Sequence, residues 1–146
     1  MVEALEAAGD WWGVAQYWRQ RALVERAPGM AWCNCANALW VHGDPQAALP
    51  LARRAVALAP ASAIAWRGLG NIHLDLGRFE LALKAFERSL DLEFDPGTAW
   101  SCSKALQGLQ RWEEAFAMAE HRLADARLGL YRSPPYWRGW QTAARI

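Results

Sequence analysis

The stretch AWRGLGNIHLD, residues 65–75, brings together side chains that could do chemistry. Its polar members are Arg67, Asn71, His73 and Asp75. An imidazole beside a carboxylate can move protons, and a guanidinium beside an amide can hold a ligand that offers acceptor oxygens. Whether these residues form an active site or the polar side of a frame depends on the elements that position them.

The composition is that of a soluble globular protein. The chain has 146 residues, of which 53% are hydrophobic and 21% charged, so it can bury the core of one domain. A net charge of +1 gives no electrostatic reason to expect nucleic acid or an anionic membrane as a partner. No apolar run approaches the roughly 20 residues of a membrane span, and the start MVEALEAAGD lacks the basic region of a secretory signal. We therefore expect a cytoplasmic protein.

Cysteine and histidine are placed unfavourably for a metal site. Cys33 and Cys35 form a CxC pair, and two such positions on a helix point about 200° apart. The third cysteine and the histidines are widely separated, at positions 102, 42, 73 and 121. No disulfide framework and no ligand-spaced motif results. We expect no metal and no cofactor.

Two residue types recur at a fixed period of 34 positions. The tryptophans are Trp32, Trp66 and Trp100, and the glycines are Gly9, Gly43 and Gly77. Between these marks, apolar residues follow the i, i+3, i+4, i+7 pattern of an amphipathic helix, as from Phe79 to Leu90. A glycine in a left-handed cap is expected to end the first helix of a unit. Each unit is therefore predicted to be a pair of antiparallel helices that stacks on its neighbours to bury its apolar faces.

The middle unit resembles the tetratricopeptide repeat (TPR), a helix–turn–helix of the same period. It carries the residues of that motif in order: Trp66, Leu69, Gly70, His73 in the Tyr place, Ala82, Phe86 and Pro96. The preceding unit keeps Trp32, Ala48 and Pro60. It departs further from the motif elsewhere, with Cys35 and Ala36 in the Leu-Gly places and Ala52 in the Phe place. The resemblance implies an all-α fold, an α-α superhelix (TPR solenoid) of antiparallel helix pairs with right-handed stacking.

The repeats divide the chain into five parts. Residues 1–28 are predicted to hold a partial N-terminal repeat with only its second helix, 11–27. Two repeats at 29–62 and 63–96 follow, then a degenerate one at 97–128. In the degenerate repeat the step from Phe79 to Trp112 falls one position short of the period, which predicts a missing residue between its helices. The truncated first repeat is expected to leave Trp11, Val14 and Trp18 uncovered, which predicts weak homodimerisation through an array end.

In TPR arrays the first helices line a concave groove, and the resemblance implies a partner-binding stripe here. Its members repeat at one period along two helices: Asn37, Trp40, Arg67, Asn71, Leu74 and Asp75. Asn37 and Asn71 are period-equivalent, which suggests two amides that bind the backbone of an extended ligand. The alternative is that the polar members are solvated side chains without a ligand. His73 is expected to pack as the family's Tyr does, and Asp75 to balance Arg67 or Arg78.

The family's carboxylate clamp, which grips the C-terminus of a peptide, is matched only at Asn37. Cys33 stands where the clamp's first Lys should be, and Gly68 where a second Asn should be. A receptor for chaperone tails is therefore disfavoured. Neither cysteine near the groove has a base partner that would make it a nucleophile, and we expect no enzyme activity.

The C-terminal segment 129–146 breaks the pattern with YRSPPYWRGWQTAARI. Pro134-Pro135 forbids a continuing helix. Three interpretations remain open: a cap over the last repeat, a nucleic-acid stacking surface, or a junction similar to that between TPRs and a bacterial glycosyltransferase domain. The leading hypothesis for the whole chain is a scaffold that binds a protein or peptide partner in the groove. The alternatives are the substrate-recognition region of a glycosyltransferase-type protein and, disfavoured by charge, an RNA-binding helical repeat.

Overall fold

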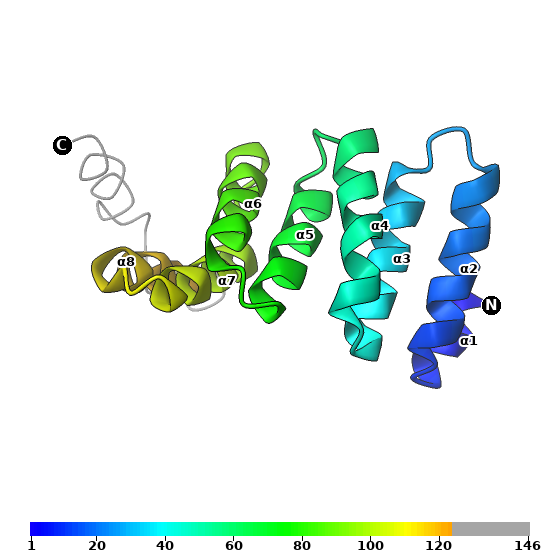
Figure 1. Ribbon diagram of the computed structural model, residues 1–146, viewed down its shortest axis with the longest axis horizontal. Helices are drawn as coiled ribbons and strands as arrows, with labels where there is room; N and C mark the ends of the chain where they lie inside the picture. The colour runs from blue at the N-terminus through cyan, green and yellow to red at the C-terminus, as the bar shows by residue number, and fades with distance from the viewer. Residues whose placement is uncertain (124–146) are drawn as a thin grey trace.

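Eight helices follow one another in antiparallel pairs in the structure, a computed structural model that describes residues 1–123 (Figure 1). They are α1 Val2–Ala7, α2 Trp11–Val24, α3 Gly29–His42, α4 Pro45–Leu58, α5 Ala63–Asp75, α6 Phe79–Leu92, α7 Pro96–Gly108 and α8 Trp112–Leu123. Within residues 1–123 there is no strand, so the predicted all-α solenoid of helix pairs is confirmed. The C-terminal segment 129–146, with its predicted cap or junction, lies outside the described residues.

The turn inside each helix pair has the same hydrogen bonds four times. The backbone N–H at the start of the second helix donates to a carbonyl five residues earlier, in the pairs Asp10 to Leu5, Asp44 to Leu39, Arg78 to His73 and Arg111 to Leu106. The residue before each donor has positive φ: Gly9 at 70°, Gly43 at 98°, Gly77 at 70° and Gln110 at 60°. This is the Schellman ending, which favours glycine because a Cβ is strained there. The periodic glycines are thus explained by one recurring turn.

The second helices repeat the sequence period at both ends. They begin at Trp11, Pro45 and Phe79 and end at Val24, Leu58 and Leu92. The aspartates at positions 10 and 44 cap the first two of them by accepting the backbone N–H three residues on. Helix bounds are therefore set by local sequence signals that recur with the period.

One residue is missing from the period, in the connection before α7. The caps of α5 and α7 are Ser62 and Asp95, which accept from the N–H of Ala65 and Thr98, so the two caps lie one position closer together than a full period. The predicted place, between the helices of the last unit, is wrong, because the connection from α6 to α7 is residues 93–95 whereas that from α4 to α5 is residues 59–62. Trp100 consequently occupies the place of Arg67 and not that of Trp66.

Complementary side-chain sizes hold each helix pair together. Phe86 is fully buried, and a Cβ built on Gly70 would lie 2.5 Å from its Cε1 atom. Only glycine allows α5 and α6 to approach this closely at that point. In the preceding pair the equivalent positions are Ala36 and Ala52, both buried. That pair distributes the volume differently, with a methyl group in place of the glycine and a small residue in place of the ring.

The N-terminal repeat is more complete than the sequence predicts. A short helix, α1, precedes α2 and packs against it. Val14 is 2% exposed, and Trp11 and Trp18 are half-buried against the core that the first five helices share. The expectation that these three side chains form an uncovered apolar face is wrong, because α1 and α3 contact α2 from its two sides.

Candidate binding groove

The first helices of the repeats form one continuous face, called here the groove face. α3 contacts α5, and α5 contacts α7, whereas none of α2, α4, α6 and α8 contacts another of that set within the described residues. An array whose first helices are packed more closely than its second helices curves toward the first helices. The groove face is therefore the concave one, and the second helices form the outer face.

Trp40 and Asp75 join α3 to α5 at the C-terminal end of the groove face. The Trp40 indole N–H donates to a carboxylate oxygen of Asp75 at 2.5 Å. The geometry therefore does not favour the predicted pairing of Asp75 with Arg67 or Arg78, because the partner of Asp75 is Trp40. Arg67 lies eight residues earlier on the same helix, about 12 Å along its axis. Asp75 instead fixes the half-buried Trp40 ring across the repeat boundary.

Arg67 and Asp95 join α5 to the start of α7. A guanidinium nitrogen of Arg67 lies 3.6 Å from a carboxylate oxygen of Asp95, and both side chains are about two-fifths exposed. Burial raises the pKa of Asp95, but the hydrogen bonds from the hydroxyl and N–H of Thr98 and the charge of Arg67 outweigh it, so the pKa lies below its usual value. An ion pair this exposed stabilises by about 1 kcal/mol at most. Arg67 remains accessible to a ligand.

Asn37 occupies the middle of the groove face on α3. Its side-chain N–H donates weakly to the sulfur of Cys33, at 3.8 Å. A Cβ built on Gly68 of α5 would lie 2.9 Å from the Asn37 Oδ1 atom. The absence of a side chain at Gly68 therefore makes room for the Asn37 amide, where the clamp of the family would have a second asparagine.

The period-equivalent of Asn37 is Asn71, which is half-buried on α5. Within residues 1–123 its amide has no hydrogen-bond partner. Leu74, one turn further, packs against the core cluster of the last three helices and is mainly frame. Leu74 therefore belongs to the core, and Asn71 keeps a half-buried amide with no hydrogen-bond partner among the described residues.

Reasoning from the sequence missed two groove residues on α7. The shortened connection before this helix puts Trp100 and Lys104 in the places of Arg67 and Asn71. Trp100 is half-buried, and Lys104 is exposed without an ion pair in the described part of the chain. The signal that could have found them is Asp95 before Pro96, a helix start that comes one position short of a full period after Ser62.

His73 and the three cysteines are buried. His73 is 4% exposed and packs as expected of its motif position; burial, helped by the charges of Arg53 and Arg78, lowers its pKa. Burial raises the pKa of Cys102 to about 12 and raises that of both other cysteines. Such thiols are protonated and poorly nucleophilic at neutral pH. The described residues contain no group of three or more His, Cys, Asp or Glu that could hold a metal ion.

The helices are short compared with a bilayer. In the part of the chain that the structure describes, none is both long and apolar enough to cross a membrane.

Comparisons with known proteins agree with this geometry. Residues 35–98 match the family model described as Tetratricopeptide repeat. A crystal structure of MamA is 19% identical with a TM-score of 0.76, covering 89% of this chain and 77% of that one. A MamA structure from Desulfovibrio magneticus RS-1 (residues 41 to the end) is 21% identical with a TM-score of 0.70, covering 92% and 75%. The TPR-like repeats of a Podosopora anserina putative kinesin light chain are 15% identical with a TM-score of 0.72, covering 92% and 76%. No curated protein sequence matches significantly.

Proposed function

We propose that this chain, whose residues 35–98 match the tetratricopeptide repeat, is a non-catalytic scaffold that binds an extended segment of a protein partner along its groove face. The observation that carries the proposal is the amide of Asn71, half-buried and without a partner in residues 1–123 at the centre of that face. An amide supplies both a donor and an acceptor, which suits the backbone of an extended peptide.

Three equivalent pairs of side chains lie on the first helices α3, α5 and α7, and all of these side chains except the buried Cys33 are at least partly exposed. They are Cys33 and Asn37 on α3, Arg67 and Asn71 on α5, and Trp100 and Lys104 on α7. An extended peptide crossing the three helices would meet the amides of Asn37 and Asn71 and then the ammonium group of Lys104. The Trp40–Asp75 hydrogen bond and the Arg67–Asp95 ion pair already join neighbouring first helices. Binding a peptide therefore requires little further ordering of the groove face, which lowers its entropy cost.

The experiment is a selection of displayed peptides on the wild-type protein, followed by fluorescence polarisation of the selected peptides. Replacing Asn37, Arg67 and Asn71 together by Ala is expected to weaken the Kd at least about tenfold, because each lost hydrogen bond to a peptide contributes about 0.5–1.5 kcal/mol. Gln46→Ala, an exposed amide on the second helix α4, is the control. Peptides that bind the triple variant as tightly as wild type would exclude the groove face as the binding surface.

We also propose that the protein works in the cytoplasm and self-associates weakly. Support for the latter comes from the N-terminal end of the array, where Leu5, Tyr17 and Val24 border a hollow of about 510 Å³ and Val24 is 82% exposed. A face of this kind favours contact with a second apolar surface. The alternative, a substrate-recognition region attached to a glycosyltransferase domain, rests on the C-terminal segment 129–146. RNA binding remains disfavoured by the near-neutral charge.

A further inference from the structure

The outer face carries a cavity between the second helices α2 and α4, on the side of α3 away from the groove face. Its volume is about 290 Å³. The lining that matters here is Trp12, Gln16 and Arg19 from α2, Trp32 from α3, and Leu51 and Arg54 from α4. One of its lining side chains, Trp12, is 53% exposed. The backbones of α2 and α4 do not approach each other closely, so side chains alone close the space between them.

A buried donor in this lining has no acceptor. Trp32 is 4% exposed, and its indole N–H has no hydrogen-bond partner among the described residues. A buried polar group without a partner costs free energy, and most such groups in folded proteins are satisfied. The period-equivalent Trp66 shows the usual solution, because its indole N–H donates to the carbonyl of Pro60 at 2.8 Å. The Nε1 atom of Trp32 has less than 1 Å² of accessible surface, so an external acceptor would satisfy it only after the neighbouring side chains move aside.

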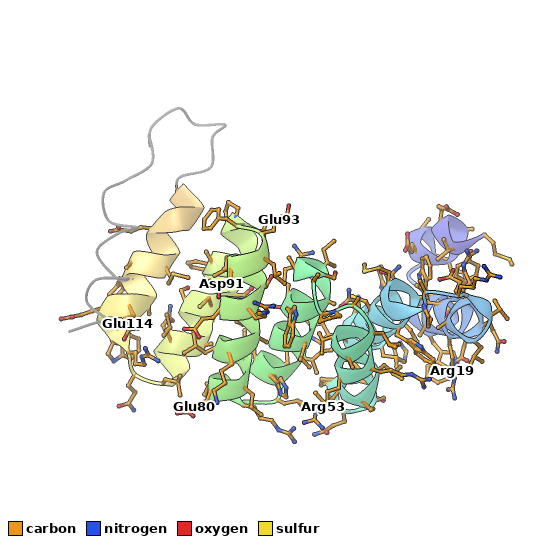
Figure 2. The ribbon with its side chains drawn as sticks, turned by 90° about the horizontal axis from the view of Figure 1, so that it is seen from above. Arg19, Arg53, Glu80, Asp91, Glu93 and Glu114 are labelled. Atoms are coloured by element: carbon orange, nitrogen blue, oxygen red, sulfur yellow. The ribbon has the colours of Figure 1, made fainter. Side chains whose placement is uncertain are left out.

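Two arginines belong to the same cavity lining, Arg19 and Arg54. The Arg54 guanidinium carbon lies 4.5 Å from the centre of the Trp32 ring. Arg19 is near enough to Cys35 for its charge to lower the pKa of that thiol against the larger, raising effect of burial. Neither arginine has a carboxylate partner within residues 1–123. Figure 2 shows Arg19 and Arg53, the neighbour of Arg54, along the same edge of the molecule.

We propose that this cavity binds a carboxylate carried by a small apolar group. The two guanidiniums and the indole N–H are donors that match carboxylate oxygens. The apolar walls, Trp12 and Leu51 among them, suit an aromatic or branched aliphatic body. A volume of about 290 Å³ is at the lower limit for small-molecule sites, so the ligand is a free organic acid or one terminal or acidic residue of a peptide.

The first probe is phenylacetate, with neutral phenylacetamide as its matched control. Calorimetry gives the Kd, and the Trp32 indole N–H resonance in a ¹⁵N correlation spectrum, assigned through Trp32→Phe, reports the predicted hydrogen bond. Phenylacetate should bind in the millimolar range or tighter and shift that resonance. Phenylacetamide should bind at least about tenfold more weakly, because a hydrogen bond to a charged group is the stronger one.

Variants separate this site from its surroundings. Arg54→Gln should weaken phenylacetate at least about tenfold, whereas Arg53→Gln, an exposed arginine on the same helix that does not line the cavity, should leave it unchanged. Arg67→Glu should also leave it unchanged, which distinguishes this site from the proposed groove. A tetrapeptide ending in Phe, as free acid and as amide, tells a peptide terminus from a free acid. No binding of either acid at 10 mM (roughly −2.7 kcal/mol), or equal binding by both arginine variants, would overturn the proposal.

Discussion

The contact between Gly70 and Phe86 gives a prediction whose size follows from the geometry. A Cβ at position 70 would lie 2.5 Å from the Phe86 Cε1 atom, whereas ordinary contacts begin at 3.4 Å. The ring would have to move by about 0.9 Å, and Phe86 is fully buried. Overpacking of this kind costs about 1–3 kcal/mol, and alanine regains about 1 kcal/mol of helix propensity over glycine. Gly70→Ala should therefore lower the free energy of unfolding by up to about 2 kcal/mol.

A double-mutant cycle isolates the cause. Phe86→Ala alone should cost about 3–5 kcal/mol, because it empties a buried site. The double variant has alanine at both positions, as the preceding pair does at Ala36 and Ala52, and the new methyl group then meets no ring. Its cost should be smaller than the sum of the single costs by at least about 1 kcal/mol.

The assay is urea unfolding followed by circular dichroism and by tryptophan fluorescence, whose coincidence tests two-state behaviour. Gly108→Ala is a useful comparison, since its Cβ would lie 2.6 Å from the ring of Phe79, which is only half-buried and has room to turn. It should cost less than Gly70→Ala. Single costs that add to within about 0.5 kcal/mol in the cycle would refute the explanation of the glycine by the ring.

Two further predictions concern pH and assembly. Burial lowers the pKa of His73, so the folded protein keeps this side chain neutral at a pH where the unfolded chain binds a proton. The free energy of unfolding should therefore fall as the pH drops below about 6.5. His73→Tyr should remove this contribution to the pH dependence, measured as urea midpoints from about pH 8 to 5. The same pH dependence of the urea midpoint in wild type and in His73→Tyr would contradict this prediction. For self-association, light scattering should give a mass that rises with concentration and that Val24→Glu returns to the monomer value. A monomer mass for wild type at high concentration would exclude it.

The repeat architecture could be predicted from the sequence because its signals are local and periodic. Gly9, Gly43 and Gly77 mark one turn type, and the aspartates at 10 and 44 cap the helices that follow. What failed was the use of a fixed period. Trp100 lies one full period after Trp66, but the helix that carries it begins one position early, because the preceding connection is shorter. By residue type Trp100 corresponds to Trp66. Counted from the helix caps Ser62 and Asp95, it corresponds to Arg67.

The side chains of the candidate groove were harder to predict than its position. The 34-residue period made Asn37 and Asn71 equivalent, and the resemblance to the tetratricopeptide repeat implied that they face a groove. The partners of Asp75 and Arg67 could not, since Trp40 and Asp95 reach them from neighbouring repeats and no rule of spacing within a helix applies. The short helix α1 was missed because its six residues carry no complete motif. Lys104 and Trp100 were missed as a direct result of the period error.

The buried apolar residues fall into two clusters, one spanning α2 to α5 with Ala85, the other spanning α6 to α8. Their boundary runs through a single helix pair, in which Gly70 of α5 lies directly against Phe86 of α6. Each cluster can melt while the other persists, since a repeat in such an array contacts only its immediate neighbours. A segment bound across α3, α5 and α7 would span both clusters, and its release could then be governed by how tightly the two halves are coupled.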